Sequence, residues 1–340
     1  MKRRDFLTTT AAGAAAIAGA GLSGLAQGGA PAAPAGQTPA PGRGGGFSPL
    51  GQPGQPANVP AHKLARISLM QLNFGGLLIP QPSANNPNPT PTPQQTLTIF
   101  DLPRVYVENY GVHNIEFQLG NVQRSETEPG FIKELKAKLD EYKVTMSQIN
   151  MEIGAQTGMT GDAAGRRQGL DRLKKWIDIA NQYGCKRLML NQNQGALTKD
   201  RRADAVAYMK ELADAGRPSG VMFSVETRGG NQPVGPDKQP ADLGMKPWEF
   251  MIGIIEEAGA HSNVDIGNVG AMDQAELHAC IKRWHARSSG NMHIKSSPNW
   301  DIGKAVAFAE SIGYKGLYAI EVQAYAAQRM VYNQILANIA

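Results

Sequence analysis

The sequence predicts an α/β fold of the (β/α)8 TIM-barrel type, built as a single domain. From Arg66 onward, short β-branched or apolar runs alternate with segments in which apolar residues recur every three or four positions. Eight short runs follow one another over roughly 280 residues, which suits such a barrel. A doubly wound open sheet is the alternative, but no glycine-rich phosphate loop of the G-x-G-x-x-G or Walker type follows the first run.

The N-terminus has the pattern of a removable export signal. Arg3 and Arg4 precede Phe6 and Leu7, and a run rich in Ala and Gly follows them. That run is shorter than the roughly 20 residues that a membrane-spanning helix needs. We therefore predict a twin-arginine signal peptide over residues 1–26, recognised by the twin-arginine export machinery. We expect no stable membrane anchor, and a periplasmic or secreted protein.

The composition of residues 27–62 predicts a disordered linker between the signal and the barrel. The segment consists mainly of Gly, Pro, Ala and Gln, with almost no large apolar side chain. It cannot bury enough surface to offset the entropy lost on ordering. The barrel domain is then expected over residues 63–340.

The expected strands end in polar loops, and the helical segments lie between them. The strand runs are residues 66–75, 113–120, 144–154, 185–195, 221–230, 262–270, 290–297 and 316–323. Helical segments include residues 131–143, 169–184 and 204–216, several of which end in glycine, and a closing helix over 328–340. A stretch rich in Pro and Asn over 79–97 is expected to be a lid, a binding loop or disordered.

Polar residues lie at the end of every expected strand with a period of two. Such a period places them on one face, while the residues between them, such as Ile115, Phe117, Val225, Ile294 and Ile320, would face the helices. These polar residues are Gln71, Asn73, Glu116, Gln118, Asn150, Glu152, Asn191, Asn193, Glu226, Arg228, Asp265, His293, Lys295, Glu321 and Gln323. Since catalytic groups of such barrels gather at the C-terminal strand ends, the pattern predicts a polar pocket there.

Four of these residues, one on each of the last four strands, could bind a metal ion. Glu226, Asp265, His293 and Glu321 provide three carboxylates and one imidazole. This donor set suits one hard or borderline divalent ion. Mn²⁺ is expected first, with Mg²⁺, Co²⁺, Fe²⁺ and Zn²⁺ as alternatives.

The runs "FSVET", "VDIGN", "MHIKS" and "YAIEV" resemble the last four strands of the xylose isomerase-like TIM-barrel superfamily. This superfamily includes sugar phosphate isomerases and epimerases as well as the family 2 AP endonucleases. The resemblance implies that Glu226, Asp265, His293 and Glu321 hold the ion. It also implies that Glu226 and Glu321 flank the substrate as catalytic acid and base.

The sequence departs from that family at two positions. Asn268 stands three residues after Asp265, where relatives commonly have a histidine, and Ser296 stands where many have an acid. The remaining histidines lie in the linker, on a helix or before strands, so a trinuclear zinc site of the endonuclease IV type cannot be assembled. The net charge is +5, and the signal residues Lys2, Arg3, Arg4 and Asp5 contribute +2 of it, so the charge left for the exported chain is too small to indicate nucleic acid as a partner.

Six residues are predicted to contact the substrate. Lys295 could neutralise a developing oxyanion or pair with an acid at the barrel rim. Arg228 could hold a substrate carboxylate or phosphate, or cap its loop. Trp300 could stack on a sugar ring or anchor a helix. The full predicted set is Glu116, Asn191, Arg228, Asn268, Lys295 and Trp300.

These observations predict an exported, metal-dependent sugar isomerase or epimerase that moves a proton next to a carbonyl through an enediolate. A lyase that acts on 3-keto-glycosides would use the same residues and stays open. A non-catalytic carbohydrate-binding barrel is the alternative from another class. The substrate would be a small sugar or keto-sugar, and the sequence leaves a homo-oligomer open.

Overall fold

The computed structural model describes the barrel and the residues just before it. The described residues are 59–81, 86, 88–154, 156–191, 197–227, 233–234, 239–240, 243–269, 272–295, 301–322 and 325–340. The predicted signal peptide and the linker up to residue 58 lie outside them, as do Arg228 and Trp300. A short helix, α1 (Ala61–Leu64), begins one residue before the expected end of the linker at residue 62.

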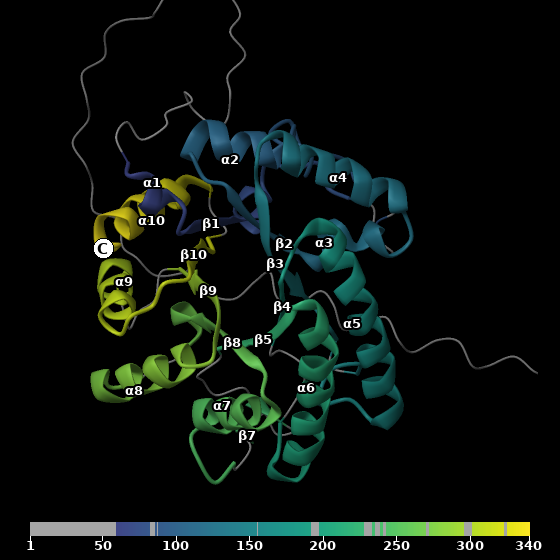
Figure 1. The fold of residues 1–340 in the computed structure, drawn as a ribbon, viewed down its shortest axis with the longest axis vertical. Coiled ribbons are helices and arrows are strands. Elements are labelled where there is room, and N and C mark those ends of the chain that lie inside the picture. Colours follow the sequence, from purple (N-terminus) through teal and green to yellow (C-terminus); the bar gives the residue numbers. More distant parts are fainter. Residues whose placement is uncertain are drawn as a thin grey trace, which may run out of the picture. The chain divides into compact units, whose positions relative to one another are not determined.

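Eight parallel strands in the described part of the chain close into a barrel (Figure 1). Their order around the barrel is β1-β10-β9-β8-β5-β4-β3-β2. Each lies within or overlaps one of the eight predicted runs, which confirms the predicted fold class. The strands are β1 (Ile67–Met70), β2 (Asn114–Gln118), β3 (Thr145–Met151), β4 (Arg187–Leu190), β5 (Met222–Glu226), β8 (His261–Asp265), β9 (Ser288–Ile294) and β10 (Leu317–Ile320). A separate two-stranded antiparallel pair, β6 (Pro233–Val234) and β7 (Gln239–Pro240), follows β5.

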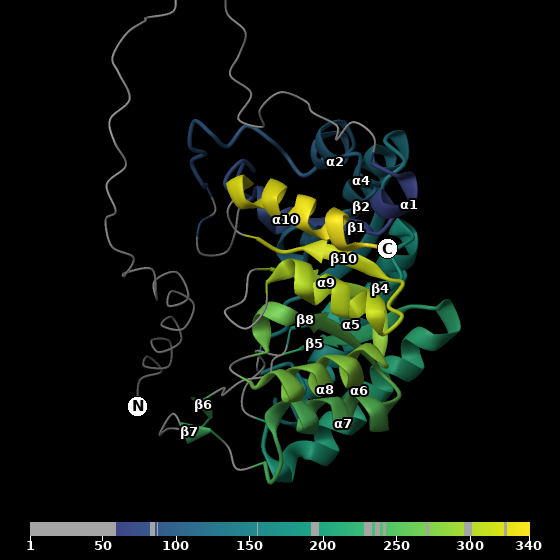
Figure 2. The same cartoon turned by 90° about the vertical axis from the view of Figure 1, so that its left-hand side faces the viewer.

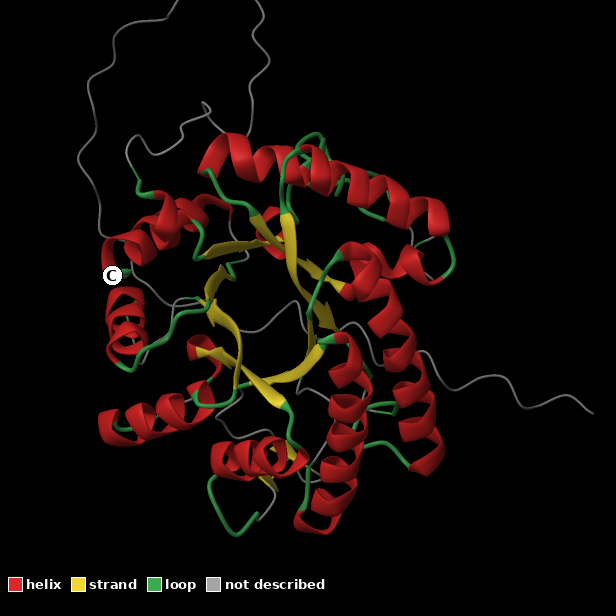
Figure 3. Cartoon of the chain, in the orientation of Figure 1, coloured by secondary structure: helices red, strands yellow, loops and turns green. Residues whose placement is uncertain are grey.

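Helices surround the strands on the outside, as Figure 3 shows. The longer ones are α2 (Leu102–Tyr110), α4 (Pro129–Glu141), α5 (Ala163–Tyr183), α6 (Arg202–Gly216), α7 (Pro247–Ala258), α8 (Gln274–His285), α9 (Ile302–Ser311) and α10 (Tyr325–Asn338). Shorter turns are α3 (Leu119–Val122) and the 3-10 helices η1 (Gln71–Phe74), η2 (Gln123–Glu126), η3 (Lys199–Arg201), η4 (Arg217–Ser219) and η5 (Ile266–Asn268). Helices adjacent in the chain pack together, as α9 and α10 do (Figure 2). No helix among the described residues is long and apolar enough to cross a membrane.

Local sequence signals explain where these helices begin and end. Asp162 and Asp273 precede α5 and α8, and their carboxylates accept hydrogen bonds from the first-turn amides of Gly165 and Glu276. At the other end of α5, Gly184 adopts a positive φ of 74°, a conformation that other residues rarely adopt. α5 starts six residues before the predicted 169, because Asp162 rather than the apolar pattern sets its beginning.

The apolar residues of the strands pack into one hydrophobic core. The five strand residues predicted to face the helices are all fully buried and belong to this core: Ile115, Phe117, Val225, Ile294 and Ile320. The polar residues between them are left for the barrel interior and its C-terminal end. The alternation in the sequence thus separates the packing face from the face that carries chemistry.

Backbone hydrogen bonds join the two ends of the predicted 79–97 stretch. The amide of Ile79 donates to the carbonyl of Leu97 at 2.7 Å, and the amide of Leu97 donates to Leu77 at 3.0 Å. Leu78 and Ile99 are buried beside these bonds. The two ends of the stretch are therefore held together between η1 and α2, whereas residues 82–85 and 87 lie outside the described residues.

Candidate metal centre

The four predicted metal ligands come together at the C-terminal end of four adjacent strands. The register pairs Asp265 on β8 with His293 on β9. The amide of Glu321 donates to the carbonyl of Ile294 at 2.9 Å, which places Glu321 just past β10 beside them. One ligand atom from each of Glu226, Asp265, His293 and Glu321 lies within 4.8 Å of every other.

The Nδ1 atom of His293 faces the three carboxylates of this cluster. It lies 3.0 Å from Oε1 of Glu226, 3.3 Å from Oε2 of Glu321 and 4.0 Å from Oδ2 of Asp265. The imidazole and the carboxylates therefore point at one common volume. Nδ1 is the imidazole atom that is placed to bind an ion there.

The Nε2 atom of His293 faces the opposite way, toward Glu116 on β2. The distance from Nε2 to Oε1 of Glu116 is 2.7 Å. Both side chains are almost completely buried, with exposed fractions of 1% and 0%. Glu116 thus lies on the far side of the ring from the cluster, which favours support of His293 over the substrate contact that we predicted.

Asp265 is held by donors on two sides. The amide of Gly267 donates to Oδ1, and the side-chain amide of Asn268 donates to Oδ2, both at 2.7 Å. The Lys295 ammonium also reaches Oδ2 at 2.7 Å and lies 3.0 Å from Oε2 of Glu321. Asn268, predicted to contact substrate, therefore binds a predicted metal ligand.

Lys295 owes its position to the glycine of the "DIGN" run. A Cβ built on Gly267 would lie 2.3 Å from Cγ of Lys295, far inside van der Waals contact. The lysine stem can lie against the backbone of η5 only because residue 267 has no side chain. The close approach of the η5 backbone to Lys295 therefore depends on the glycine of the "DIGN" run.

Burial differs sharply across the centre. The side chain of Asp265 is completely buried, whereas Glu321 and Lys295 have exposed fractions of 18% and 25%. The open side of the cluster is consequently formed by a carboxylate and an ammonium group. Within the described part of the cluster, these two side chains are the most accessible to a substrate at the barrel mouth.

The centre holds an excess of negative charge. Burial, followed by the charge of Glu321, raises the pKa of Asp265 well above its usual range, although Lys295 acts against this. Burial alone would lower the pKa of His293, but the charge of Glu116 and hydrogen bonds to Glu116, Glu226 and Glu321 raise it overall. Burial opposes ionisation of Glu321, yet His293 and Lys295 together lower its pKa.

This electrostatic pattern and this donor set fit a divalent cation. Three carboxylate oxygens and one imidazole nitrogen suit Mg²⁺, Mn²⁺ and their neighbours in hardness. A cation in the common volume would relieve the repulsion between the buried carboxylates. Among the described histidines, His293 alone joins a group of this kind.

A layer of amides beneath the cluster was not part of the predicted site. It comprises Gln148 on β3, Asn263 on β8 and Asn291 on β9, all fully buried. Asn263 and Asn291 stand two residues before Asp265 and His293, so the same period of two could have found them. The remaining predicted residue, Asn191, follows β4 at the same end of the barrel.

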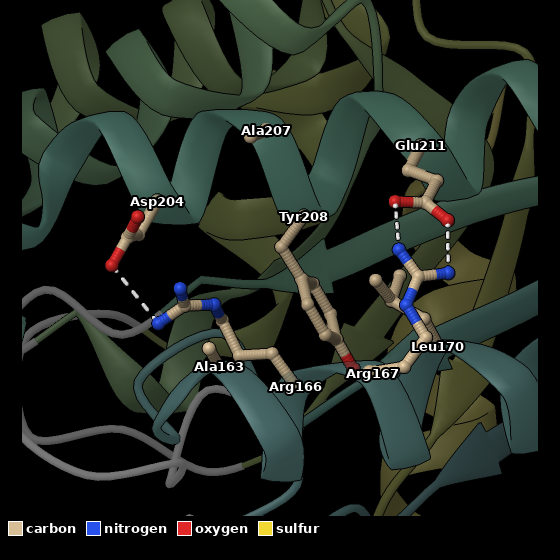
Figure 4. Close-up of a pocket in the computed structure, with 8 residues that line it drawn as sticks. All are labelled: Ala163, Arg166, Arg167, Leu170, Asp204, Ala207, Tyr208 and Glu211. Atoms are coloured by element: carbon tan, nitrogen blue, oxygen red, sulfur yellow. Dashed lines mark hydrogen bonds and ion pairs between the residues drawn. The ribbon is translucent and has the colours of Figure 1, made fainter.

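A second concave region lies outside the barrel on α5 and α6 (Figure 4). It has a volume of about 180 Å³. Its charged residues pair with one another, since Arg166 lies 2.9 Å from Asp204 and Arg167 lies 2.8 Å from Glu211. A ligand would have to compete with these ion pairs, so the cluster in the barrel is the stronger candidate.

Solved structures with the same fold include proteins that act on small molecules. A xylose isomerase-like TIM barrel protein from Mycobacterium smegmatis in complex with magnesium has 16% identity and a TM-score of 0.55, covering 82% of this chain and 99% of its own. D-psicose 3-epimerase from Clostridium cellulolyticum has 11% identity and a TM-score of 0.52, covering 71% and 89%. A probable 3-DHS dehydratase from Bacillus anthracis has 10% identity and a TM-score of 0.55, covering 79% and 97%.

The sequence of the barrel matches a known protein family with the same fold. No curated protein matches the sequence at a significant level. Residues 105–329, which hold the four predicted ligands and most of the barrel, match the family model described as "Xylose isomerase-like TIM barrel". The chain therefore belongs to the xylose isomerase-like TIM barrel family.

Proposed function

We propose that the protein is a divalent-metal-dependent sugar isomerase or epimerase. The observation that carries this proposal is the placement of two glutamates around the metal-ligand cluster. Glu226 is the last residue of β5 and Glu321 directly follows β10. These are the outer two of the four adjacent strands, with β8 and β9 between them. Their carboxylates approach Nδ1 of His293 from these two strands, at 3.0 and 3.3 Å.

Glu226, Asp265, Glu321 and Nδ1 of His293 would hold the ion. When bound, a divalent ion supplies polarisation of a substrate carbonyl, which makes the hydrogen on the adjacent carbon more acidic. The excess negative charge of the buried cluster supports this assignment. Mn²⁺ is proposed first, and the magnesium complex of the Mycobacterium smegmatis protein keeps Mg²⁺ among the candidates.

The two glutamates would carry the proton. One carboxylate removes the proton from the carbon next to the carbonyl, and the electron pair moves onto the carbonyl oxygen to give an enediolate. In an epimerase, the other glutamate, protonated beforehand, returns a proton to the opposite face of the same carbon. In an isomerase, the proton is returned to the neighbouring carbon instead.

Lys295 would assist this step from the open side of the cluster. Its ammonium lies 3.0 Å from Oε2 of Glu321 and is partly exposed. It can donate a hydrogen bond to negative charge that develops on a substrate oxygen. Its charge, together with His293, also lowers the pKa of the Glu321 carboxyl against the effect of burial. Glu321 is therefore ionised, as a catalytic base must be.

A lyase is the second candidate, and one contact favours it. Asn268, which stands where relatives commonly have a histidine, donates its side-chain amide to Asp265, so the polar group at this position differs from the one expected in a sugar isomerase of this family. The same enediolate can expel a leaving group from the next carbon, which would cleave a 3-keto-glycoside. One structural neighbour bears the name of a dehydratase, and dehydration is also an elimination.

We also propose that the protein is exported through the twin-arginine pathway to the periplasm or beyond. The support is the Arg3-Arg4 pair with Phe6, Leu7 and the apolar run that follows. Changing both arginines to lysine should retain the uncleaved protein in the cytoplasm, as measured by cell fractionation. Unchanged export of that variant would contradict the proposal.

Metal analysis and solvent exchange test the proposed function together. The purified domain should hold about one divalent ion per chain, and keto-sugars or 3-keto-glycosides should take up deuterium from D₂O next to the carbonyl. Glu321→Gln should slow this uptake by roughly 10²–10⁴-fold, the usual contribution of a catalytic base. Glu108→Gln, at an exposed ion pair on α2, is the matched control.

The outcomes separate the candidates. Release of a leaving group along with deuterium uptake identifies the lyase, and uptake with a changed sugar identifies the isomerase or epimerase. Sugar binding without exchange would favour the non-catalytic barrel. Lack of stoichiometric metal, or unchanged exchange in Glu321→Gln, would overturn the mechanism.

A further inference from the structure

We infer that Glu116 is a positioning residue that sets which nitrogen of His293 binds the metal ion. The inference deepens the proposed function, since it rests on the proposed metal site. Glu116 lies on β2, and His293 lies on β9 across the barrel interior. Their side chains nevertheless meet, with Oε1 of Glu116 2.7 Å from Nε2 of His293.

Glu116 is itself held by amide donors from other strands. Asn150 on β3 donates to Oε1 at 2.6 Å, and Asn291 on β9 donates to Oε2 at 2.8 Å. Gln148 makes a longer contact to Oε1, at 3.3 Å. A carboxylate with both oxygens engaged cannot turn away from the histidine, so the orientation of His293 is set from three strands.

The carboxylate decides between two arrangements of the ring. A neutral imidazole has one N–H donor and one acceptor nitrogen. Carboxylates lie on both sides of His293, since Nδ1 also lies 3.0 Å from Oε1 of Glu226. With Nε2–H donated to Glu116, the lone pair of Nδ1 points at Glu226, Asp265 and Glu321, as an ion at that place requires.

The surrounding layer is not built for stability. Small barrels of this type usually fill their interior with branched apolar residues. Here Gln148, Asn263 and Asn291 surround the carboxylate, and Oε1 of Gln148, Nδ2 of Asn263 and Oδ1 of Asn291 have no hydrogen-bond partner among the described residues. Burying a charge and unpaired polar atoms costs free energy. The amide layer therefore does not serve stability, and its role in orienting His293 is a reason for the protein to keep it.

Two variants with similar chemistry separate positioning from general packing. Glu116→Gln keeps the shape and removes the charged acceptor beneath His293. Glu310→Gln removes another poorly exposed carboxylate that pairs with Arg66 at 2.6 Å and accepts from Tyr318 at 2.6 Å, outside the metal centre. Mn²⁺ affinity is measured by calorimetry on both proteins and on the wild type.

We expect Glu116→Gln to bind Mn²⁺ roughly 10–100-fold more weakly, the range found for partners of metal-bound histidines. Glu310→Gln should keep the wild-type affinity even if its melting temperature falls. In the Mg²⁺-saturated wild type, ¹⁵N NMR of His293 should show the proton on Nε2 and none on Nδ1. Glu116→Gln should lose that pattern.

Each outcome bears on one claim. Equal Mn²⁺ affinity and an unchanged Nε2–H signal in Glu116→Gln would overturn the inference and leave the proposed function intact. Failure of the wild type to bind any divalent ion would overturn the proposed function, and exchange protection of the Nε2–H proton without metal would then still test the contact. If Glu116→Gln does not fold, Asn150→Ala, which removes one donor to Glu116, should still weaken Mn²⁺ binding, and unchanged affinity would count against the inference.

Discussion

The ammonium group of Lys295 lies 2.7 Å from Oδ2 of Asp265, a direct ion pair inside the predicted ligand cluster. Asp265 is fully buried and Lys295 is partly open to the barrel mouth. A fixed positive charge therefore lies beside a carboxylate that would share a divalent ion. Since like charges repel, Lys295 should weaken metal binding while it offers a donor to the substrate.

Lys295→Met should therefore change metal affinity and turnover in opposite directions. We expect Mn²⁺ to bind about tenfold more tightly, because the repulsion between the ammonium and the ion is removed. Turnover should fall roughly 10²-fold, because one donor to the developing oxyanion is lost. Calorimetry and deuterium uptake measure the two effects. Lys304→Met, on the exposed surface of α9, is the control, and a parallel loss of both quantities would contradict the prediction.

Gly267→Ala should reproduce part of the loss of turnover expected for Lys295→Met, although no charged residue is replaced. The new Cβ would lie 2.3 Å from Cγ of Lys295 and would push the lysine stem away from Asp265. We expect turnover to fall about tenfold while the fold is kept, because the flexible lysine can move. Gly120→Ala, where no atom lies within 4 Å of the added carbon, is the control. Wild-type turnover in Gly267→Ala would show that the contact does not position Lys295.

Metal removal should lower the thermal stability of the barrel. An ion present at 100 times its Kd stabilises the folded state by about 2.7 kcal/mol, which corresponds to roughly 5 °C for a domain of about 280 residues. Differential scanning calorimetry with EDTA and with Mn²⁺ measures the shift. Asp265→Asn should lose most of it, and an equal shift in that variant would place the ion elsewhere.

The rise in melting temperature that the metal ion causes should also become smaller as the pH falls. The pKa of His293 is raised above its usual 6.5 by Glu116 and its other carboxylate partners, despite the opposing effect of burial. A proton on Nδ1 must leave before an ion can bind, so competition should begin above pH 6.5 and grow at lower pH. Calorimetric titrations at several pH values measure this. An affinity that does not vary with pH would exclude His293 as a ligand.

His285 should make the fold less stable in mild acid. Burial lowers the pKa of His285 to about 4, and neither of its ring nitrogens has a hydrogen-bond partner in the part of the chain that the structure describes. Below its ordinary value of 6.5 the unfolded chain takes up a proton that the folded chain refuses. Stability present above pH 6.5 is thus lost between 6.5 and about 4, by up to about 3 kcal/mol.

Urea unfolding across this pH range tests the effect. His285→Phe keeps a ring against Tyr314, whose ring centroid lies 4.6 Å from that of His285. The variant should lack the part of the stability loss in acid that His285 causes. His62→Gln, on the exposed surface of α1, is the control. A wild-type pH profile in His285→Phe would contradict the assignment.

Much of the barrel follows from local patterns in the chain. Runs such as "VMFSVE" and "GNMHI" are strands because alternating apolar side chains can reach the helices on one face only. The same period of two placed Glu226, Asp265, His293 and Glu321 on the inner face. Parallel strands in a closed barrel bring their C-terminal ends together, so convergence of the four residues was also predictable.

Contacts across the barrel were not predictable in this way. The pairing of β2 with β3 shifts between Ile115–Met146 and Glu116–Gln148, so Ser147 is an extra residue on β3. No turn signal or alternation in the sequence marks such a shift. The shift sets how Gln148 and Asn150 reach Glu116, and hence the amide layer under His293.

The sequence by itself determined the fold class, the strand order and the residue types available for a metal ion, because these depend on periodicity and on short connections between neighbours. Only the tertiary structure decided that Glu116 supports His293 and that Asn268 and Lys295 bind Asp265. Those roles depend on distances between side chains of different strands and loops, which strand stagger, the β3 shift and the missing side chain of Gly267 set together.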